Sequence, residues 1–329
     1  MGGKHFDGPF APMCELFVSQ KRAAGLKYDQ QAMLLRRFDD FCKNYMIQNY
    51  AISEEIAVAW AKLRPNEREV YRHSRVSEMQ RFSVFLAKQG YPSYLLPALP
   101  KKGERHTPYI FTQDEIRRIF LCLDTLTPTN RTTRHFVFPV LIRVLYGCGL
   151  RISEALALTK HDLDIEKGVL HIQHGKNDRE RIVPMSDSLC EVCISYLQTA
   201  HVETSDHMPL FYNKDRVAYT KSGVTKAFRD ILWDVGIPWC GKYLGPRVHD
   251  LRHTFVCHNI RKWAENGIAI QHMLPILSKY IGHTSISATQ WYLRLTPEAY
   301  PHIRDVCERE LGGMYANIPS FTAEDAYDE

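Results

Sequence analysis

The sequence predicts a mainly α-helical protein of two domains, the second of which carries a small antiparallel β-sheet. Three observations support this fold class. Apolar residues recur at helical spacing before residue 90, a proline-rich stretch follows at Tyr91–Tyr109, and two short apolar runs flank a polar turn around Lys176. The length of 329 residues is enough for roughly two domains of about 150 residues, each with its own core.

The first hundred residues show the pattern of about four helices. In the segment KYDQQAMLLRRFDDFCKNY, the residues Leu34, Phe38, Phe41 and Tyr45 form one apolar stripe opposite the charged side chains. Ser53 precedes two glutamates, which is typical of a helix N-cap and an acidic first turn. A further amphipathic helix that ends near Gly90 is indicated by Val70, Met79, Phe82, Phe85 and Leu86.

A connector follows the helical region. Tyr91–Tyr109 contains four prolines and the basic segment KKGER, and prolines at this density interrupt helices and leave an extended chain. We therefore predict a helical domain over 1–100, a linker over 101–110 and a second domain over 111–329.

The second domain is predicted to be helical apart from one hairpin. Thr112 before two acidic residues indicates a helix start, and Phe136–Gly147 is apolar enough for a buried helix. The runs Val169–Gln173 and Arg181–Met185 flank a turn rich in Gly, Asn and Asp, which predicts two antiparallel strands.

Composition indicates an ordinary globular protein. Hydrophobic residues make up 45% of the chain and charged residues 24%, and no apolar run is long enough to span a membrane. The nine cysteines are an odd number without an export signal, so we expect reduced thiols and a cytoplasmic protein.

The net charge of +5 hides an uneven distribution. The net charge is +6 over residues 1–106, +5 over residues 107–304 and −6 over residues 305–329. A basic body suits a polyanionic partner such as nucleic acid, although a solvated basic surface explains the charge equally well.

Nucleotide and metal chemistry lack the motifs they require. Gly175-Lys176 is followed by Asn177 rather than Ser or Thr, and no GxGxxG follows a strand, so no nucleotide cofactor is expected. Cys190 and Cys193 have zinc-ligand spacing but no second pair. The segment between His249 and His253 lacks the glutamate of a zinc hydrolase, so we expect no metal.

What remains is a set of basic, imidazole and phenol side chains on separate predicted elements. Taken singly, each has a structural explanation as a helix cap, a solvated turn residue, a core histidine or a packing aromatic residue. The set consists of Arg151, Lys176, His249, Arg252, His283 and Tyr292.

The order and context of these residues resemble the tyrosine recombinase (phage integrase) family. The motifs that carry the resemblance are YGCGLRISEALAL, GKNDRERIVP, HDLRHTF and IGHTSISATQWY, within about Phe111–Pro297. The helical first domain is similar, more loosely, to the core-binding module of the family. The stretch between Arg252 and His283 is several residues longer than the compact family pattern.

The resemblance implies that Tyr292 is the nucleophile, which attacks a DNA phosphodiester, forms a 3′-phosphotyrosyl link and releases a 5′-hydroxyl. Because the phosphorane transition state gathers negative charge, Arg151 and Arg252 are suited to hold its oxygens. Glu154, one helical turn after Arg151, is expected to orient that arginine.

Three further roles follow from the same resemblance. Lys176 is the expected general acid for the leaving 5′-oxygen, His249 a proton shuttle for the tyrosine and His283 a hydrogen-bond donor to the scissile phosphate. The phosphotyrosine retains the bond energy and the cationic side chains stabilise the charge, so the reaction is expected to need neither ATP nor metal.

The implied partner is double-stranded DNA, around which the two domains would close as a clamp. Family members act as homo-tetramers on two synapsed sites, and Ile303–Leu311 is a candidate for docking on a neighbouring subunit; the sequence does not reveal whether accessory proteins take part. The alternatives are a type IB topoisomerase and a DNA-binding protein that no longer cleaves. Candidate phosphate contacts in the first domain are Arg36, Arg37, Lys43, Arg72, Arg75 and Arg81.

Overall fold

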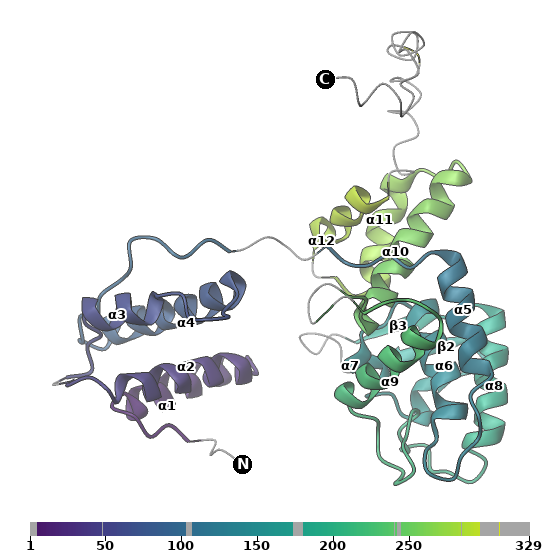
Figure 1. The fold of residues 1–329 in the computed structure, drawn as a ribbon, viewed down its shortest axis with the longest axis horizontal. Coiled ribbons are helices and arrows are strands. Elements are labelled where there is room, and N and C mark those ends of the chain that lie inside the picture. The colour runs from purple at the N-terminus through teal and green to yellow at the C-terminus, as the bar shows by residue number, and fades with distance from the viewer. Residues whose placement is uncertain are drawn as a thin grey trace, which may run out of the picture. The chain divides into compact units, whose positions relative to one another are not determined.

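The computed structural model describes residues 5–47, 49–102, 107–173, 180–239, 241, 245–283, 285–296 and 309. The chain divides into two compact units, Met1–His106 and Thr107–Glu329 (Figure 1). The described elements are mainly helices, with one small antiparallel sheet in the second unit, and this confirms the predicted fold class.

The first unit is a helical domain with an aromatic core. Ser53 caps its third helix by accepting a hydrogen bond of 3.3 Å from the amide of Ile56, as predicted. Its described helices are α1 (Ala11–Ala23), α2 (Asp29–Cys42), α3 (Glu54–Ala61) and α4 (Glu69–Lys88). The largest buried side chains of the unit include Phe10, Phe38, Trp60 and Phe82.

The buried face of α2 lies slightly to one side of the predicted stripe. Leu34 and Phe41 are half-buried at its border, and the helix ends before Tyr45. One polar residue takes part in the buried face, because Asp39 accepts the amide N–H of Phe10 at 2.8 Å. The buried residues of α2 are Ala32, Leu35, Phe38, Asp39 and Cys42.

The second unit is built around α6, which packs against α5, α8 and α10. Thr112 and Glu115 form a reciprocal capping box at the start of α5, which confirms the predicted helix start. The longer described helices are α5 (Gln113–Asp124), α6 (Arg134–Gly147), α8 (Asp187–Ala200), α9 (Lys221–Asp234), α10 (Val248–Glu265) and α11 (Ile270–Tyr280). The shorter ones are α7 (Ile152–Ala155), η1 (Lys160–Asp162), α12 (Ile286–Gln290) and η2 (Trp291–Leu295).

The sheet has three strands in the order β1-β2-β3, all antiparallel. The predicted hairpin corresponds to β2 (Val169–Ile172) and β3 (Arg181–Pro184), with Leu170 opposite Val183. The strand β1 (Leu163–Asp164) was not predicted, since two residues are too few for an alternating pattern.

A second apolar cluster lies where α10, α11, α12 and η2 meet, at one end of the unit (Figure 1). Its buried members include Val256 and Ile260 of α10, Leu274 of α11 and Tyr292 of η2. The predicted nucleophile, Tyr292, is therefore part of the apolar cluster that packs against the carboxyl-terminal part of α10. None of the described helices combines the length and apolarity that crossing a bilayer requires.

Candidate active site

A glycine turn places the first arginine of the site. After α6 the chain reverses at Gly149, whose φ of +58° lies in the left-handed region. A Cβ atom there would lie 2.5 Å from the ring of Phe255 on α10, so only glycine fits this position. The turn places Arg151 immediately before the start of α7, and its side chain is 20% exposed.

Glu154 on α7 is a buried carboxylate that three arginines approach. Arg151 Nη1 donates to its Oε1 at 2.6 Å, and the two Nη atoms of Arg181 donate to both oxygens at 3.1 and 2.9 Å. Arg252 Nη1 lies 3.9 Å from Oε2. Glu154 therefore contacts Arg151, as the sequence suggested, and also joins it to two other cations.

The charge on Glu154 is held by these neighbours. Burial acts to raise the pKa of this carboxyl, but the hydrogen bonds and charge of Arg181, together with Arg151, outweigh burial and bring the pKa to about 2. The carboxylate is thus ionised at neutral pH. A buried carboxylate stays charged only when cations are paired with it, as the arginines are here.

Arg252 is fixed by main-chain carbonyls from two distant segments. Its Nη1 donates to Gly149 O at 2.8 Å and its Nη2 to Ile281 O at 2.5 Å. Burial, followed by the positive charge of Arg151, lowers its pKa to about 10, so the guanidinium stays protonated at neutral pH. The long stretch between Arg252 and His283, which contains α11, does not prevent this convergence.

Tyr292 lies buried beside these cations, with 3% of its surface exposed. Its hydroxyl is 2.7 Å from Nδ1 of His253, and its ring stacks on that of His283, with centroids 6.2 Å apart. Burial raises the pKa of Tyr292 to about 12, although the charges of Arg252 and Arg151 act to lower it. The phenol is therefore protonated at neutral pH.

The two predicted histidines take different positions. His249 is exposed on the first turn of α10, and its ring meets that of His253 edge-on, with centroids 4.8 Å apart. Partial desolvation by the surrounding chain and then the charges of Arg252 and Arg247 lower the pKa of His249, which favours its neutral form. His283 Nδ1 lies 2.9 Å from Thr289 Oγ1.

A groove opens beside this cluster, lined by Arg151, Arg181, Lys279, Tyr280 and His283 among others. Lys176, the predicted general acid, lies outside the described residues, so its role stays a prediction. In the ranges that the structure describes, no three His, Cys, Asp or Glu side chains are grouped as metal ligands would be, and Cys190 and Cys193 on α8 are free thiols.

Two residues of the cluster were missed by the sequence analysis. Arg181 was treated as a strand residue and as part of the motif GKNDRERIVP, and nothing local to it in the sequence indicated its contact with Glu154. His253 was considered only as a zinc ligand together with His249. Its position four residues after His249 was the available signal, because residues at i and i+4 share one face of a helix.

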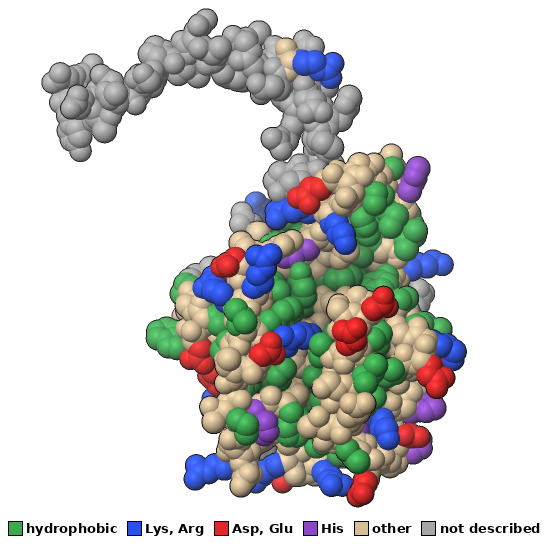
Figure 2. Space-filling view, turned by 90° about the vertical axis from the view of Figure 1, so that its right-hand side faces the viewer, with side chains coloured by type: hydrophobic (Ala, Val, Ile, Leu, Met, Phe, Trp, Pro, Cys, Tyr) green, Lys and Arg blue, Asp and Glu red, His purple; other side chains and the backbone are tan. Residues whose placement is uncertain are grey.

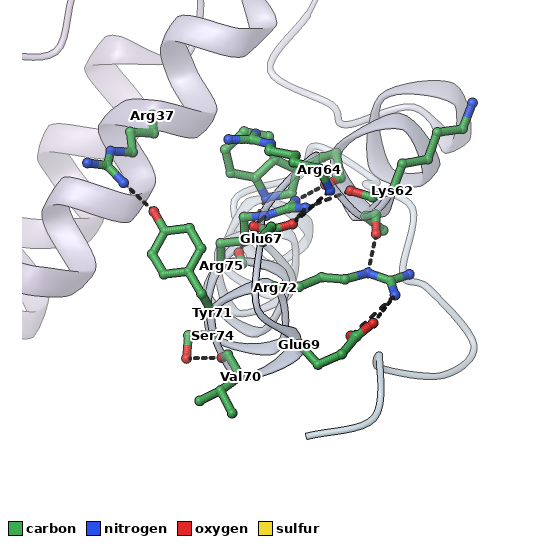
Figure 3. A network of polar contacts seen from close by, with 12 residues as sticks. Arg37, Lys62, Arg64, Glu67, Glu69, Val70, Tyr71, Arg72, Ser74 and Arg75 are labelled. Carbon is green, nitrogen blue, oxygen red and sulfur yellow. Dashed lines mark hydrogen bonds and ion pairs between the residues drawn. The ribbon is translucent and has the colours of Figure 1, made fainter. Parts of the chain in front are cut away.

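One candidate DNA contact is wrong. Arg75 is buried within the first unit with 1% of its surface exposed, and its guanidinium binds Glu67 at 2.6 and 2.7 Å (Figure 3). It also donates to the carbonyls of Trp60 and Lys62. A phosphate does not reach this side chain in the folded unit, so Arg75 stabilises the domain instead.

The other candidates of the first unit retain contact with solvent, and their role as DNA contacts stays a prediction. The partners of these five residues are Phe6 for Arg36, Tyr71 for Arg37, Asp7 and Asp40 for Lys43, Glu69 for Arg72 and Glu78 for Arg81. Figure 2 draws a face of the second unit, on which basic side chains are interspersed with acidic and apolar ones and do not form one block.

Comparison with known proteins identifies the family of this arrangement. The chain is 29% identical over 301 residues to the integrase/recombinase candidate y4rB of Sinorhizobium fredii, with 88% of this chain and 94% of that protein covered. It is 28% identical over 279 residues to the tyrosine recombinase XerA of Thermococcus onnurineus, with 84% and 88% covered.

Among solved structures, the XerH site-specific recombinase bound to its palindromic difH substrate matches with a TM-score of 0.63 at 19% identity, covering 84% of this chain and 78% of that one. This likeness shows the fold. The model of the phage integrase family matches residues 110–299, which is more than half of the chain, and the chain therefore belongs to this family of tyrosine recombinases.

Proposed function

We propose that this protein is a site-specific recombinase that cleaves and rejoins DNA strands through Tyr292. The hydroxyl oxygen of Tyr292 attacks a phosphodiester, the 3′-phosphotyrosyl bond forms, and the bond to the 5′-oxygen breaks. The observation that carries the proposal is the buried Glu154 that holds three arginines beside a buried phenol. Membership of the phage integrase family supports the same reaction.

The arginines supply the positive charge that the transition state requires. Arg151 is partly exposed and lines the groove, so a scissile phosphate that enters there would meet its guanidinium first. Arg252 is immobilised by two carbonyl groups, so its charge is placed before the substrate binds. Donors that are fixed in advance stabilise developing charge without a reorganisation cost.

Proton transfer is the second requirement. Because the pKa of Tyr292 is about 12, removing its proton at pH 7 costs about 7 kcal/mol. The proton must therefore leave while the oxygen–phosphorus bond forms. Lys176 is the proposed donor to the leaving 5′-oxygen, with His249 as shuttle, His283 as phosphate donor and Glu154 as the residue that orients Arg151. Because the phosphotyrosine conserves bond energy, the hydroxyl of another strand reverses the step without ATP.

The proposed substrate is duplex DNA held between the two units, and the proposed assembly is a homo-tetramer on two synapsed sites in the cytoplasm. The solved XerH relative is bound to DNA, and the basic charge of residues 1–304 suits the same polyanion. The proposed docking segment Ile303–Leu311 lies outside the described residues except for Arg309.

A covalent trap tests the proposal. The protein is incubated with a duplex library of random sequence, adducts that resist detergent are collected, and the break points are sequenced. We expect the wild-type protein to select one sequence. On a nicked suicide substrate of that sequence, adduct should accumulate with the wild type and with Tyr146→Phe, a control phenol on α6, and be absent with Tyr292→Phe.

The outcomes separate the alternatives. Tight DNA binding without any adduct would identify a protein that binds but does not cleave. Relaxation of a supercoiled plasmid that lacks the selected sequence would identify a type IB topoisomerase.

The same assay tests the requirement for metal. We expect the yield of covalent adduct to be unchanged in excess EDTA, because the guanidinium groups of Arg151 and Arg252 provide the stabilising charge. Loss of adduct in EDTA that is restored by added Mg²⁺ would contradict this scheme.

A further inference from the structure

We propose that His253 accepts the proton of Tyr292 during strand cleavage and returns it during strand joining. The proposal rests on the proposed function and puts His253 in place of His249 as the immediate acceptor of the Tyr292 proton. Its basis is the contact of 2.7 Å between Nδ1 of His253 and the hydroxyl of Tyr292.

The surroundings of His253 fix this contact from several sides. The ring lies one helical turn after His249 and meets it edge-on at 4.8 Å. It also contacts the rings of Trp291 and Tyr292, with centroids 6.4 and 5.5 Å away. Because α10 and η2 pack together, both partners of the hydrogen bond are held by secondary structure.

The protonation states give the hydrogen bond a direction. Burial is the largest cause that lowers the pKa of His253, and the neighbouring His249, Arg252 and Arg247 lower it further, so the ring is neutral before substrate binds and the phosphate anion has to offset this lowering during the reaction. Tyr292 is neutral as well, and a phenol is the stronger donor of the two. The hydroxyl therefore donates to Nδ1, and the ring hydrogen resides on Nε2.

The proposed step balances in protons and bonds. As the bond between the Tyr292 oxygen and phosphorus forms, the O–H bond breaks and the proton moves to Nδ1 of His253. The bond from phosphorus to the 5′-oxygen breaks, and that oxygen takes a proton from Lys176. The anionic phosphate stabilises the transient imidazolium, and in strand joining the proton returns from Nδ1 to the phenolate oxygen.

Two substitutions at His253 test the step. His253→Phe retains the ring and removes the acceptor, whereas His253→Asn retains an acceptor oxygen that does not take up a proton. Single-turnover adduct formation on the suicide substrate should fall at least about a hundredfold in His253→Phe and less in His253→Asn, as for loss of a general base. The DNA dissociation constant should not change.

His258 provides a matched control. It lies on the same helix and makes the same kind of contact, since its Nδ1 is 2.9 Å from the hydroxyl of Tyr146, outside the proposed site. His258→Asn should cleave at the wild-type rate. A fall as large as that of His253→Asn would show a packing effect and overturn the inference.

A second substrate separates this role from that of the leaving-group acid. Replacing the bridging 5′-oxygen by sulfur gives a leaving group that needs no proton. Lys176→Ala should regain its rate on this DNA, whereas His253→Phe should remain slow. Rescue of His253→Phe would overturn the inference.

The failures of the two proposals are distinguishable. If the wild type forms no adduct at all, the proposed function fails. If it does and both His253 variants react within threefold of its rate, only the role of His253 fails. Should His253→Phe not fold, the rate of His253→Asn on the two substrates decides alone.

Discussion

Replacing Arg252 by alanine should slow formation of the covalent adduct by about a thousandfold. Loss of one fixed donor to transition-state charge costs 10²–10³-fold in comparable sites, and Arg252 contributes a full positive charge in a buried position. The measurement is the single-turnover rate of adduct formation on the suicide substrate. Arg252→Lys should recover part of the rate, since it keeps the charge and loses the planar fork of donors.

Arg134 is the control for Arg252. It is a partly exposed arginine of α6 whose ion pair with Asp230 is 3.8 Å long, and Arg134→Ala should leave the rate unchanged. A rate for Arg252→Ala within threefold of the wild type, with an unchanged melting temperature, would contradict the proposed role of this guanidinium.

Replacing Glu154 by alanine should lower the free energy of unfolding of the second unit by about 3–5 kcal/mol. The substitution leaves Arg151, Arg181 and Arg252 without their shared carboxylate, and breaking a buried ion pair on one side costs this amount. Urea denaturation at pH 7 measures the effect. Glu154→Gln keeps an acceptor but no charge, so its loss should be smaller.

The pH dependence of stability provides a second measure for Glu154. Its pKa is about 2 in the folded protein and ordinarily 4.5, so its contribution is present above pH 4.5 and is lost as pH falls towards 2. The difference in stability between the wild type and Glu154→Gln should therefore shrink over that range. Glu203→Ala, at an exposed position, should stay within about 0.5 kcal/mol of the wild type. If the free energy of unfolding of Glu154→Ala also stays within about 0.5 kcal/mol of the wild type, the ion cluster does not stabilise the second unit and the prediction is wrong.

Local signals in the sequence accounted for the elements that depend on local chemistry. The caps at Ser53 and Thr112 and the two main strands of the hairpin were predicted because capping side chains and turn residues act on the chain next to them. The resemblance supplied the candidate residues of the site. Of these, the structure brings Arg151 and Arg252 close enough to Tyr292 for their charges to act on its pKa.

Partners that lie far apart in the chain were not predictable in this way. Arg181 meets Glu154 across 27 positions and Tyr280 across 99, and no sequence period reports such pairs. Arg75 was different, because its spacing from Met79 and Phe82 already placed it on the buried face of α4. A charged residue at a core position indicates an internal ion pair, and this rule would have removed it from the candidate DNA contacts.

The anchoring of both arginines by distant carbonyls has a consequence for synthesis of the protein. Arg151 holds the carbonyl of Gly282, and Arg252 holds that of Ile281. Because a ribosome delivers the chain from its amino end, these acceptors emerge well after α7 and after the whole of α10. A nascent chain therefore carries these two guanidinium groups only partly fixed, and the capacity to cut DNA is withheld until translation has passed Gly282.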